Sequence, residues 1–236
     1  MTKIKGRTEI AELGEFGLID YLTEPFTPKC KTTIKGVGDD AAVIEASKST
    51  AMLVSTDTMV EGIDFDLTYF PPKHLGYKAV MANLSDIYAM NGTPKQITVS
   101  LGISARFSVE DIEALYSGMR RACEAHQVDI VGGDTTSSLT GLAISITAIG
   151  VGKKDEVAYR SGANETDLIC VSGNLGAAYM GLQILEREKA VYNQQVIEAQ
   201  QQAQRTGGSV DEAIAQIPQP DFMGKEYLLE RQMKPE

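Results

Sequence analysis

The sequence is poor in the residues that build disulfide frameworks and transition-metal sites. Its 236 residues include two histidines, three cysteines and no tryptophan. Cys30, Cys123 and Cys170 lie far apart and form no C-x-x-C pair, so neither a zinc cluster nor a disulfide framework is predicted, and a reducing cytoplasm fits. With His74 and His126 as the only histidines, oxygen ligands and a hard cation such as Mg²⁺ are favoured.

Positive charge and long apolar runs are also scarce. The chain carries 22 Lys and Arg against 32 Asp and Glu, which gives a net charge of −10 at pH 7. Nucleic acids and anionic membrane surfaces attract basic patches, so neither is a predicted partner. The sequence has no run of about 18 apolar residues and no apolar segment behind Met1, so neither a membrane span nor a signal peptide is expected.

A phosphate-binding loop of the Walker type, G-x-x-x-x-G-K-[ST], does not occur in the sequence. Instead, glycines lie directly against two carboxylates in Gly36-Val37-Gly38-Asp39-Asp40. A glycine turn lets a phosphate approach the backbone, whereas two acids repel it, and a divalent cation between them removes the conflict. The segment therefore predicts part of a metal–nucleotide site, with an ordinary acidic turn as the alternative.

Three further segments place an acid beside hydroxyl groups or glycines. They are Ser55-Thr56-Asp57-Thr58 at the end of a predicted strand at 51–56, Asn83-Leu84-Ser85-Asp86 in a predicted apolar helix at 71–90, and Gly132-Gly133-Asp134-Thr135-Thr136 after a predicted strand at 128–131. Each has an ordinary alternative: a cap, an ion pair between Lys78 and Asp86, or a tight turn. Together with Asp40, and with Arg160 as a candidate phosphate clamp, they favour a site for metal ions and phosphates.

The hydrophobic pattern predicts an α+β fold. Further helices are expected at 13–22, 108–126, 176–189 and 222–233, and further strands at 96–103, 143–151 and 168–171. Ser108 and Asp111 form a predicted capping box, and residues 23–35 are expected to be a loop. The mixture of strands and helices at hairpin distances favours a mixed, mainly antiparallel sheet over a doubly wound parallel sheet.

These segments, in this order, resemble the thiamine-monophosphate kinase family of the aminoimidazole-ribonucleotide synthetase-like superfamily. The resemblance is carried by residues 36–42, 55–62, 77–86, 132–136 and 160–163 and spans about residues 14–185. It implies an enzyme that uses Mg²⁺ to transfer the γ-phosphoryl group of ATP directly to thiamine monophosphate, which forms thiamine diphosphate. Positioning and metal ions, rather than a covalent nucleophile, would carry such a transfer.

The resemblance also implies roles for particular residues. The implied metal ligands are Asp40, Ser55, Thr56, Asp57, Asp86 and Asp134. Gly133, Asp134 and Arg160 would contact ATP, and no catalytic nucleophile is implied. Asp64 stands where the family usually carries a substrate-contacting His, and Ser137 stands where many members carry a basic residue.

The resemblance further implies a domain organisation. Residues 1–189 would form an N-terminal ATP- and metal-binding domain, residues 190–220 a Gln- and Ala-rich insert, and residues 221–236 a helix and linker toward a second domain outside this chain. The family domain dimerises through its sheet, so a homodimer is expected. Two alternatives stay open. One is another ATP-dependent member of the superfamily, such as a purine-pathway or selenophosphate synthetase, and the other is a non-catalytic nucleotide-binding or dimerisation module.

Overall fold

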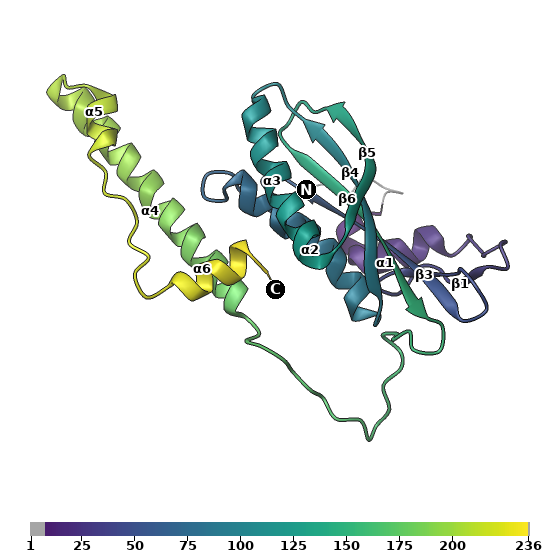
Figure 1. The fold of residues 1–236 in the computed structure, drawn as a ribbon. Coiled ribbons are helices and arrows are strands. Elements are labelled where there is room, and N and C mark those ends of the chain that lie inside the picture. Colours follow the sequence, from purple (N-terminus) through teal and green to yellow (C-terminus); the bar gives the residue numbers. More distant parts are fainter. Residues whose placement is uncertain (1–7, 236) are drawn as a thin grey trace.

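A six-stranded sheet forms the body of the molecule, and a helical arm follows it in the chain (Figure 1). The computed structural model describes residues 8–235. The strands are β1 (Thr33–Lys35), β2 (Ala42–Glu45), β3 (Thr50–Val60), β4 (Thr93–Ile103), β5 (Asp129–Ser137) and β6 (Ala143–Lys153). Their spatial order is β1-β2-β3-β6-β4-β5, and all neighbours are antiparallel except β4 and β5. The predicted α+β class with a mainly antiparallel sheet is confirmed.

The long strands have one apolar face. In β6 the side chains of Ile144, Ile146 and Ala148 are buried, whereas Ser145 and Thr147 between them are only partly covered. This alternation follows from the two-residue period of a strand. The same period in β3 and β4 completes one apolar surface, which an antiparallel sheet of this kind buries under helices.

Two helices cover this surface in layers. Helix α2 (Pro72–Ala89) packs on the sheet, and α3 (Val109–His126) packs on α2. Proline in its first turn starts α2, as the sequence predicted, and its buried residues extend from Leu75 to Ile87. The predicted capping box of Ser108 and Asp111 opens α3.

Several predicted boundaries differ from the structure. The strands expected at 51–56 and 128–131 continue to Val60 and Ser137, because β6 and β4 pair with them over that length. Residues 55–58 and 132–136 therefore lie within strands rather than after them. Strand β1 falls within the loop expected at 23–35, and β2 lies where no element was predicted. Helix α1 (Ile10–Thr23) contains the helix predicted at 13–22, with a bend at Gly14.

The arm contains three helices, α4 (Ala177–Thr206), α5 (Val210–Ala215) and α6 (Glu226–Met233). Helix α4 passes without interruption through the predicted boundary between residues 189 and 190 and contacts both α5 and α6. The division of the chain into domain, insert and linker stays a prediction. The helix expected at 222–233 begins at Glu226. Among the described helices, none combines the length and apolarity that crossing a membrane requires.

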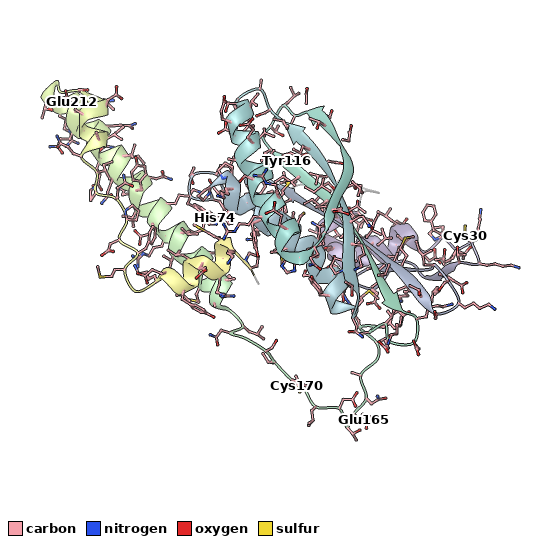
Figure 2. The ribbon with its side chains drawn as sticks, viewed as in Figure 1. Cys30, His74, Tyr116, Glu165, Cys170 and Glu212 are labelled. Carbon is pink, nitrogen blue, oxygen red and sulfur yellow. The ribbon has the colours of Figure 1, made fainter. Side chains whose placement is uncertain are left out.

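An extended segment, which contains Glu165 and Cys170, joins the sheet to the arm (Figure 2). The strand predicted at 168–171 lies here and is not formed: Leu168 and Ile169 are 89% and 97% exposed, and no described strand pairs with them. Strand-forming side chains do not make a strand unless a neighbour satisfies the backbone N–H and C=O groups.

Candidate metal and phosphate site

Polar contacts join the middle of β3 to the buried face of α2. The Ser55 hydroxyl donates a hydrogen bond to Asp86 Oδ2. Asn83 Oδ1 accepts from the N–H of Asp57 at 3.0 Å, and Asn83 Nδ2 donates to the carbonyl of Ala79 at 2.9 Å. Ser55 and Asn83 are buried, and buried polar atoms of this kind need partners. An otherwise apolar helix therefore presents one polar strip to β3.

A third acid, Asp40, reaches this region from the turn between β1 and β2. Arg160 Nε donates to Asp40 Oδ1 at 2.9 Å, and a second guanidinium nitrogen pairs with the same oxygen. The backbone N–H of Arg160 also donates to Asp39 Oδ1 at 3.4 Å. The sequence predicts Arg160 as a phosphate clamp. It gives no local signal for the pairing of Arg160 with Asp40, because 120 positions separate the two residues.

The carboxylate of Asp86 is held in an unfavourable environment. Burial raises its pKa, and the negative charges of Asp57 and Asp40 raise it further. The hydrogen bond from Ser55 and the positive charge of Arg160 act in the opposite direction. The net effect is a raised pKa for Asp86. Because the charges of Asp57 and Asp40 act on Asp86, a shared cation would stabilise the three carboxylates in their charged forms.

The structure does not bring Thr56 and Asp134 to this cluster. Thr56 Oγ1 donates to the carbonyl of Ile146 at 3.1 Å and so points away from the face that Ser55 shares with Asp57. Asp134 lies on β5, and β6 and β4 separate that strand from β3. Three inter-strand spacings amount to roughly 14 Å, which is too far for a common metal ion.

Gly133 has a structural role at the edge of the sheet. A Cβ atom at this position would lie 1.8 Å from the carbonyl oxygen of Val99 on the neighbouring strand β4. Any larger residue would push β5 away from β4, so glycine is required here for strand packing. This packing role does not test the predicted contact of Gly133 with ATP, which stays a prediction.

Asp64 and Lys78 form a separate pair of charges. Asp64 Oδ2 accepts from the N–H of Val60 at 2.7 Å and closes the turn after β3. The Lys78 ammonium lies 5.2 Å from the ring centre of Phe70, and burial lowers its pKa, which the charge of Asp64 partly offsets. Within residues 8–235 Asp86 therefore has Ser55 as its partner, and the alternative ion pair with Lys78 is not formed.

The donor atoms of the cluster suit a hard cation. Among the described residues, no three His, Cys, Asp or Glu side chains are grouped closely enough to enclose a metal ion by themselves. Mg²⁺ does not need such a cage, because it commonly binds one or two carboxylates and takes its remaining ligands from water and substrate phosphates. Asp57 and Asp86, with Asp40 nearby, fit that mode of binding.

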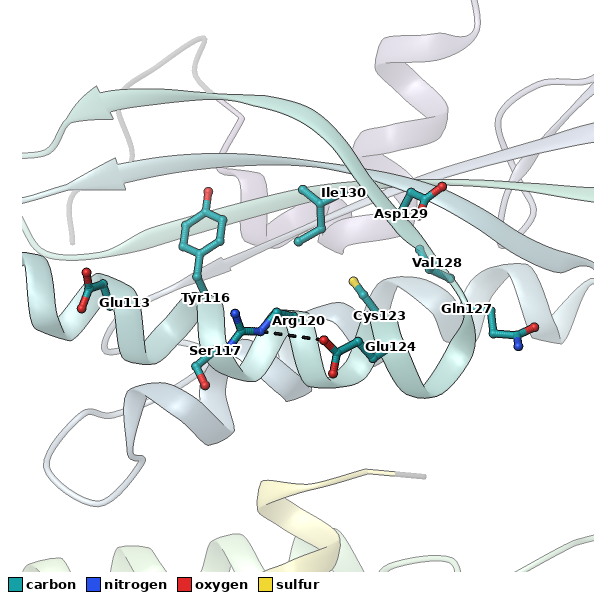
Figure 3. Close-up of a pocket in the computed structure, with 10 residues that line it drawn as sticks. All are labelled: Glu113, Tyr116, Ser117, Arg120, Cys123, Glu124, Gln127, Val128, Asp129 and Ile130. Atoms are coloured by element: carbon teal, nitrogen blue, oxygen red, sulfur yellow. Dashed lines mark ion pairs between the residues drawn. The ribbon is translucent and has the colours of Figure 1, made fainter.

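A large cavity lies elsewhere, between α3 and the start of β5 (Figure 3). Its volume is about 1010 Å³, and Tyr116, Cys123 and Ile130 are among its lining residues. Burial, with the charges of Asp129 and Glu124, raises the pKa of Cys123 to about 11. The thiol is therefore protonated at neutral pH and is not a nucleophile.

Residues 38–152 match the model of the family described as AIR synthase related protein, N-terminal domain. The matched segment is 115 of the 236 residues, and over it the chain is similar to that family. The matched region contains β2–β6, α2, α3 and all three carboxylates of the cluster.

Curated relatives and solved structures agree with the family match. The chain is 38% identical over 184 residues to a thiamine-monophosphate kinase of Bacillus subtilis and 37% identical over 183 residues to one of Aquifex aeolicus, which covers 78% of this chain and 56% of each relative. It spans about half the length of these relatives. A structure of AaThiL complexed with AMPPCP and TMP is 29% identical, with a TM-score of 0.74 over 98% of this chain and 62% of that one. The thiamine-monophosphate kinase from Aquifex aeolicus gives a TM-score of 0.67 at 25% identity, over 97% of this chain and 62% of that one. The predicted resemblance is confirmed.

The raised pKa of Asp86 predicts a pH-dependent cost to folding in metal-free protein. The folded state binds a proton at Asp86 more tightly than the unfolded chain, so this carboxylate lowers the free energy of unfolding as the pH rises above the ordinary Asp value of 3.8, and the loss is complete once the pH exceeds the folded pKa. Asp86→Asn should therefore raise the free energy of unfolding near pH 7, and the gain should shrink as the pH falls toward the ordinary Asp value of 3.8. Urea denaturation in EDTA at several pH values measures this.

Asp20→Asn, on the exposed surface of α1, is the matched control for that experiment and should show no such pH-dependent difference. A variant at Asp86 that is less stable than the wild type at pH 7 without metal would contradict the electrostatic account of the cluster.

Proposed function

We propose that this chain is the ATP- and metal-binding part of a thiamine-phosphate kinase, a transferase that uses Mg²⁺ to move the γ-phosphoryl group of ATP to thiamine monophosphate. The observation that carries the proposal is the convergence of Ser55, Asp57, Asp86 and Asp40 inside the family-matched region. The curated relatives named as thiamine-monophosphate kinases, and the AaThiL complex with AMPPCP and TMP, support ATP and thiamine monophosphate as the substrates.

The residues of the cluster have complementary roles in this proposal. A bound Mg²⁺ neutralises phosphate charge and orients the reacting phosphates. Asp57 and Asp86 would hold it, and Ser55 fixes the orientation of the Asp86 carboxylate through its hydrogen bond. Arg160 would bind a phosphate of the nucleotide, and Asp40, which pairs with Arg160 in this structure, would then be available to the cation. Positioning of this kind is the main demand of phosphoryl transfer.

The remaining predicted ligands stay proposals with a more distant role. Asp134 and Gly133 lie three strands away from Asp57, and Thr56 points to the other face of the sheet. They would therefore serve a separate ion or another part of the nucleotide. Asp64 closes the turn after β3 through its bond with the N–H of Val60, and it is also proposed to contact thiamine monophosphate.

The metal assignment predicts that binding of Mg-ATP depends on the two central aspartates. Asp57→Asn and Asp86→Asn should each weaken binding at least about tenfold, because each removes a charged ligand while it keeps the size of the side chain. Titration calorimetry with ATP in excess Mg²⁺ measures the affinities. Asp20→Asn is again the control and should bind like the wild type; wild-type affinity in both cluster variants would remove the assignment.

We further propose that this chain alone is incomplete for catalysis, because it covers 56% of its curated relatives. The 236-residue chain should bind Mg-ATP yet form thiamine diphosphate at a small fraction of the rate expected for such kinases, on the order of 1 s⁻¹ or more. Product formation can be followed by chromatography. Turnover at that full rate would contradict the proposal, and phosphorylation of another acceptor instead of thiamine monophosphate would favour a different member of the superfamily.

A homodimer through the sheet is also part of the proposal. All nine residues of the edge strand β5 are exposed, including Val131 at 57%, and within the described residues its outer edge has no neighbouring strand. Unpaired edges of this kind attract a second strand. Light scattering should give twice the 25.5 kDa of one chain. Val131→Lys should shift the mass toward the monomer, whereas Val191→Lys on the exposed arm should not, and a monomeric wild type would contradict the dimer.

The setting of the enzyme is proposed to be the cytoplasm. The described cysteines Cys30, Cys123 and Cys170 are all free thiols, as a reducing compartment allows. The net charge of −10 continues to argue against nucleic acid as a partner. The test is alkylation of the protein from freshly lysed cells. In a reducing compartment all three cysteines should be found as free thiols.

A further inference from the structure

A cavity of opposite electrostatic character lies between α2, α3 and α6. Its volume is about 340 Å³, and it is lined by Lys73, His74, Tyr77, Gly118, Arg121, Glu230 and Lys234. Figure 2 shows His74 on the side of the body that faces α6. The lining contains three permanent positive charges and one carboxylate, whereas the whole chain carries ten more acids than bases.

Two of the three positive charges of this cavity have no ion-pair partner in the part of the chain that the structure describes. Neither Lys73 nor Arg121 forms an ion pair there, in contrast to the adjacent Arg120, whose Nε lies 3.9 Å from Glu124 Oε1. The Lys234 ammonium lies 6.0 Å from the ring centre of Tyr77. Two cations without a carboxylate partner, in a concave surface, attract an anion more strongly than isolated surface lysines do.

The start of α2 adds to the same potential. Its first turn contains no acidic residue and no side-chain cap, and Lys73 and His74 occupy it instead. Helices prefer acids at this end, because the free backbone N–H groups carry partial positive charge. The basic residues therefore oppose the preference of the helix, and an anion in the cavity would offset that cost.

The floor of the cavity is rigid. Helices α2 and α3 cross so closely that a Cβ atom at Gly118 would lie 1.8 Å from the carbonyl oxygen of Lys73, and one at Gly76 would lie 2.0 Å from that of Leu115. Backbone contact of this kind fixes the positions from which Lys73 and Arg121 extend. The backbone from which both side chains extend is therefore fixed before a ligand arrives, which lowers the backbone part of the entropic cost of binding.

We propose that this cavity binds a small metabolite through a phosphate or diphosphate group, without a metal ion. Arg121 would bind phosphate oxygens through its planar guanidinium, and Lys73 would act as a point charge on the same group. The volume suits a small molecule rather than a polymer. Lys73 precedes Asp86 by thirteen residues on α2, or about 20 Å along the helix, so the cavity is distinct from the acidic cluster.

The test uses pyrophosphate and inorganic phosphate as probes for the 236-residue chain, in EDTA and at low ionic strength. Titration calorimetry should show saturable binding of pyrophosphate that weakens as salt is added. Lys73→Gln combined with Arg121→Gln should weaken it at least tenfold. Arg120→Gln, in the cavity between α3 and β5 instead, should not change it. Arg121→Lys, which keeps the charge, should lose less than the double variant.

Two comparisons separate this inference from the proposed function. Asp86→Asn should leave metal-free pyrophosphate binding unchanged, and the double variant should keep its Mg-ATP affinity. Circular dichroism verifies that the variants are folded, and Lys73→Gln alone replaces the double variant if that protein does not fold. Absence of pyrophosphate binding by the wild type, or equal affinity in wild type and variants, would overturn the proposal.

Discussion

The contact between Asn83 and β3 is the constraint on which the acidic cluster depends. Asn83 is 1% exposed and lies in the middle of an apolar helix, yet its side chain bonds both the backbone of β3 and the preceding turn of α2. The first bond sets the position of α2 along the strand. One helical turn later, Asp86 then meets the hydroxyl of Ser55. Packing of apolar side chains alone would tolerate a small shift of α2 along β3. The hydrogen bonds from Asp57 to Asn83 and from Ser55 to Asp86 do not tolerate it.

Charge is arranged in opposite ways at the two ends of α2. Near its end, Asp86 lies with Asp57 and Asp40, and one guanidinium offsets only part of their charge. Near its beginning, Lys73 and His74 lie beside Arg121 with one carboxylate among them. An acidic protein that handles phosphates can do so either with a cation between acids and ligand or with a local basic surface. The two proposals together assign one of each to this fold, about 20 Å apart on one helix.

The sequence predicted the helices and the fold class better than the details of the cluster. The apolar run at 71–90 and the capping box at Ser108 depend on neighbours within one turn, so local patterns identify them. The extension of β3 through Asp57 depends on pairing with β6, whose partner residues lie about ninety positions away. The expected strand at 168–171 shows the converse, because suitable side chains without a partner leave the backbone unpaired. Alternation along β3 was available in the sequence and separates Thr56 from Ser55 and Asp57 once residues 55–57 are placed inside a strand.

The identity of residue 83 follows from what its two partners require. The N–H of Asp57 needs an acceptor, and the carbonyl of Ala79 receives a donor from the same side chain. Leucine at this position would fill the space but remove the acceptor from the partly buried N–H of Asp57, at a cost of about 0.5–1.5 kcal/mol. Aspartate would accept from that N–H but would lose the donor and add a fourth carboxylate to a cluster whose charges already repel one another. An amide supplies both the acceptor and the donor without charge, so residue 83 adds no further negative charge to the cluster.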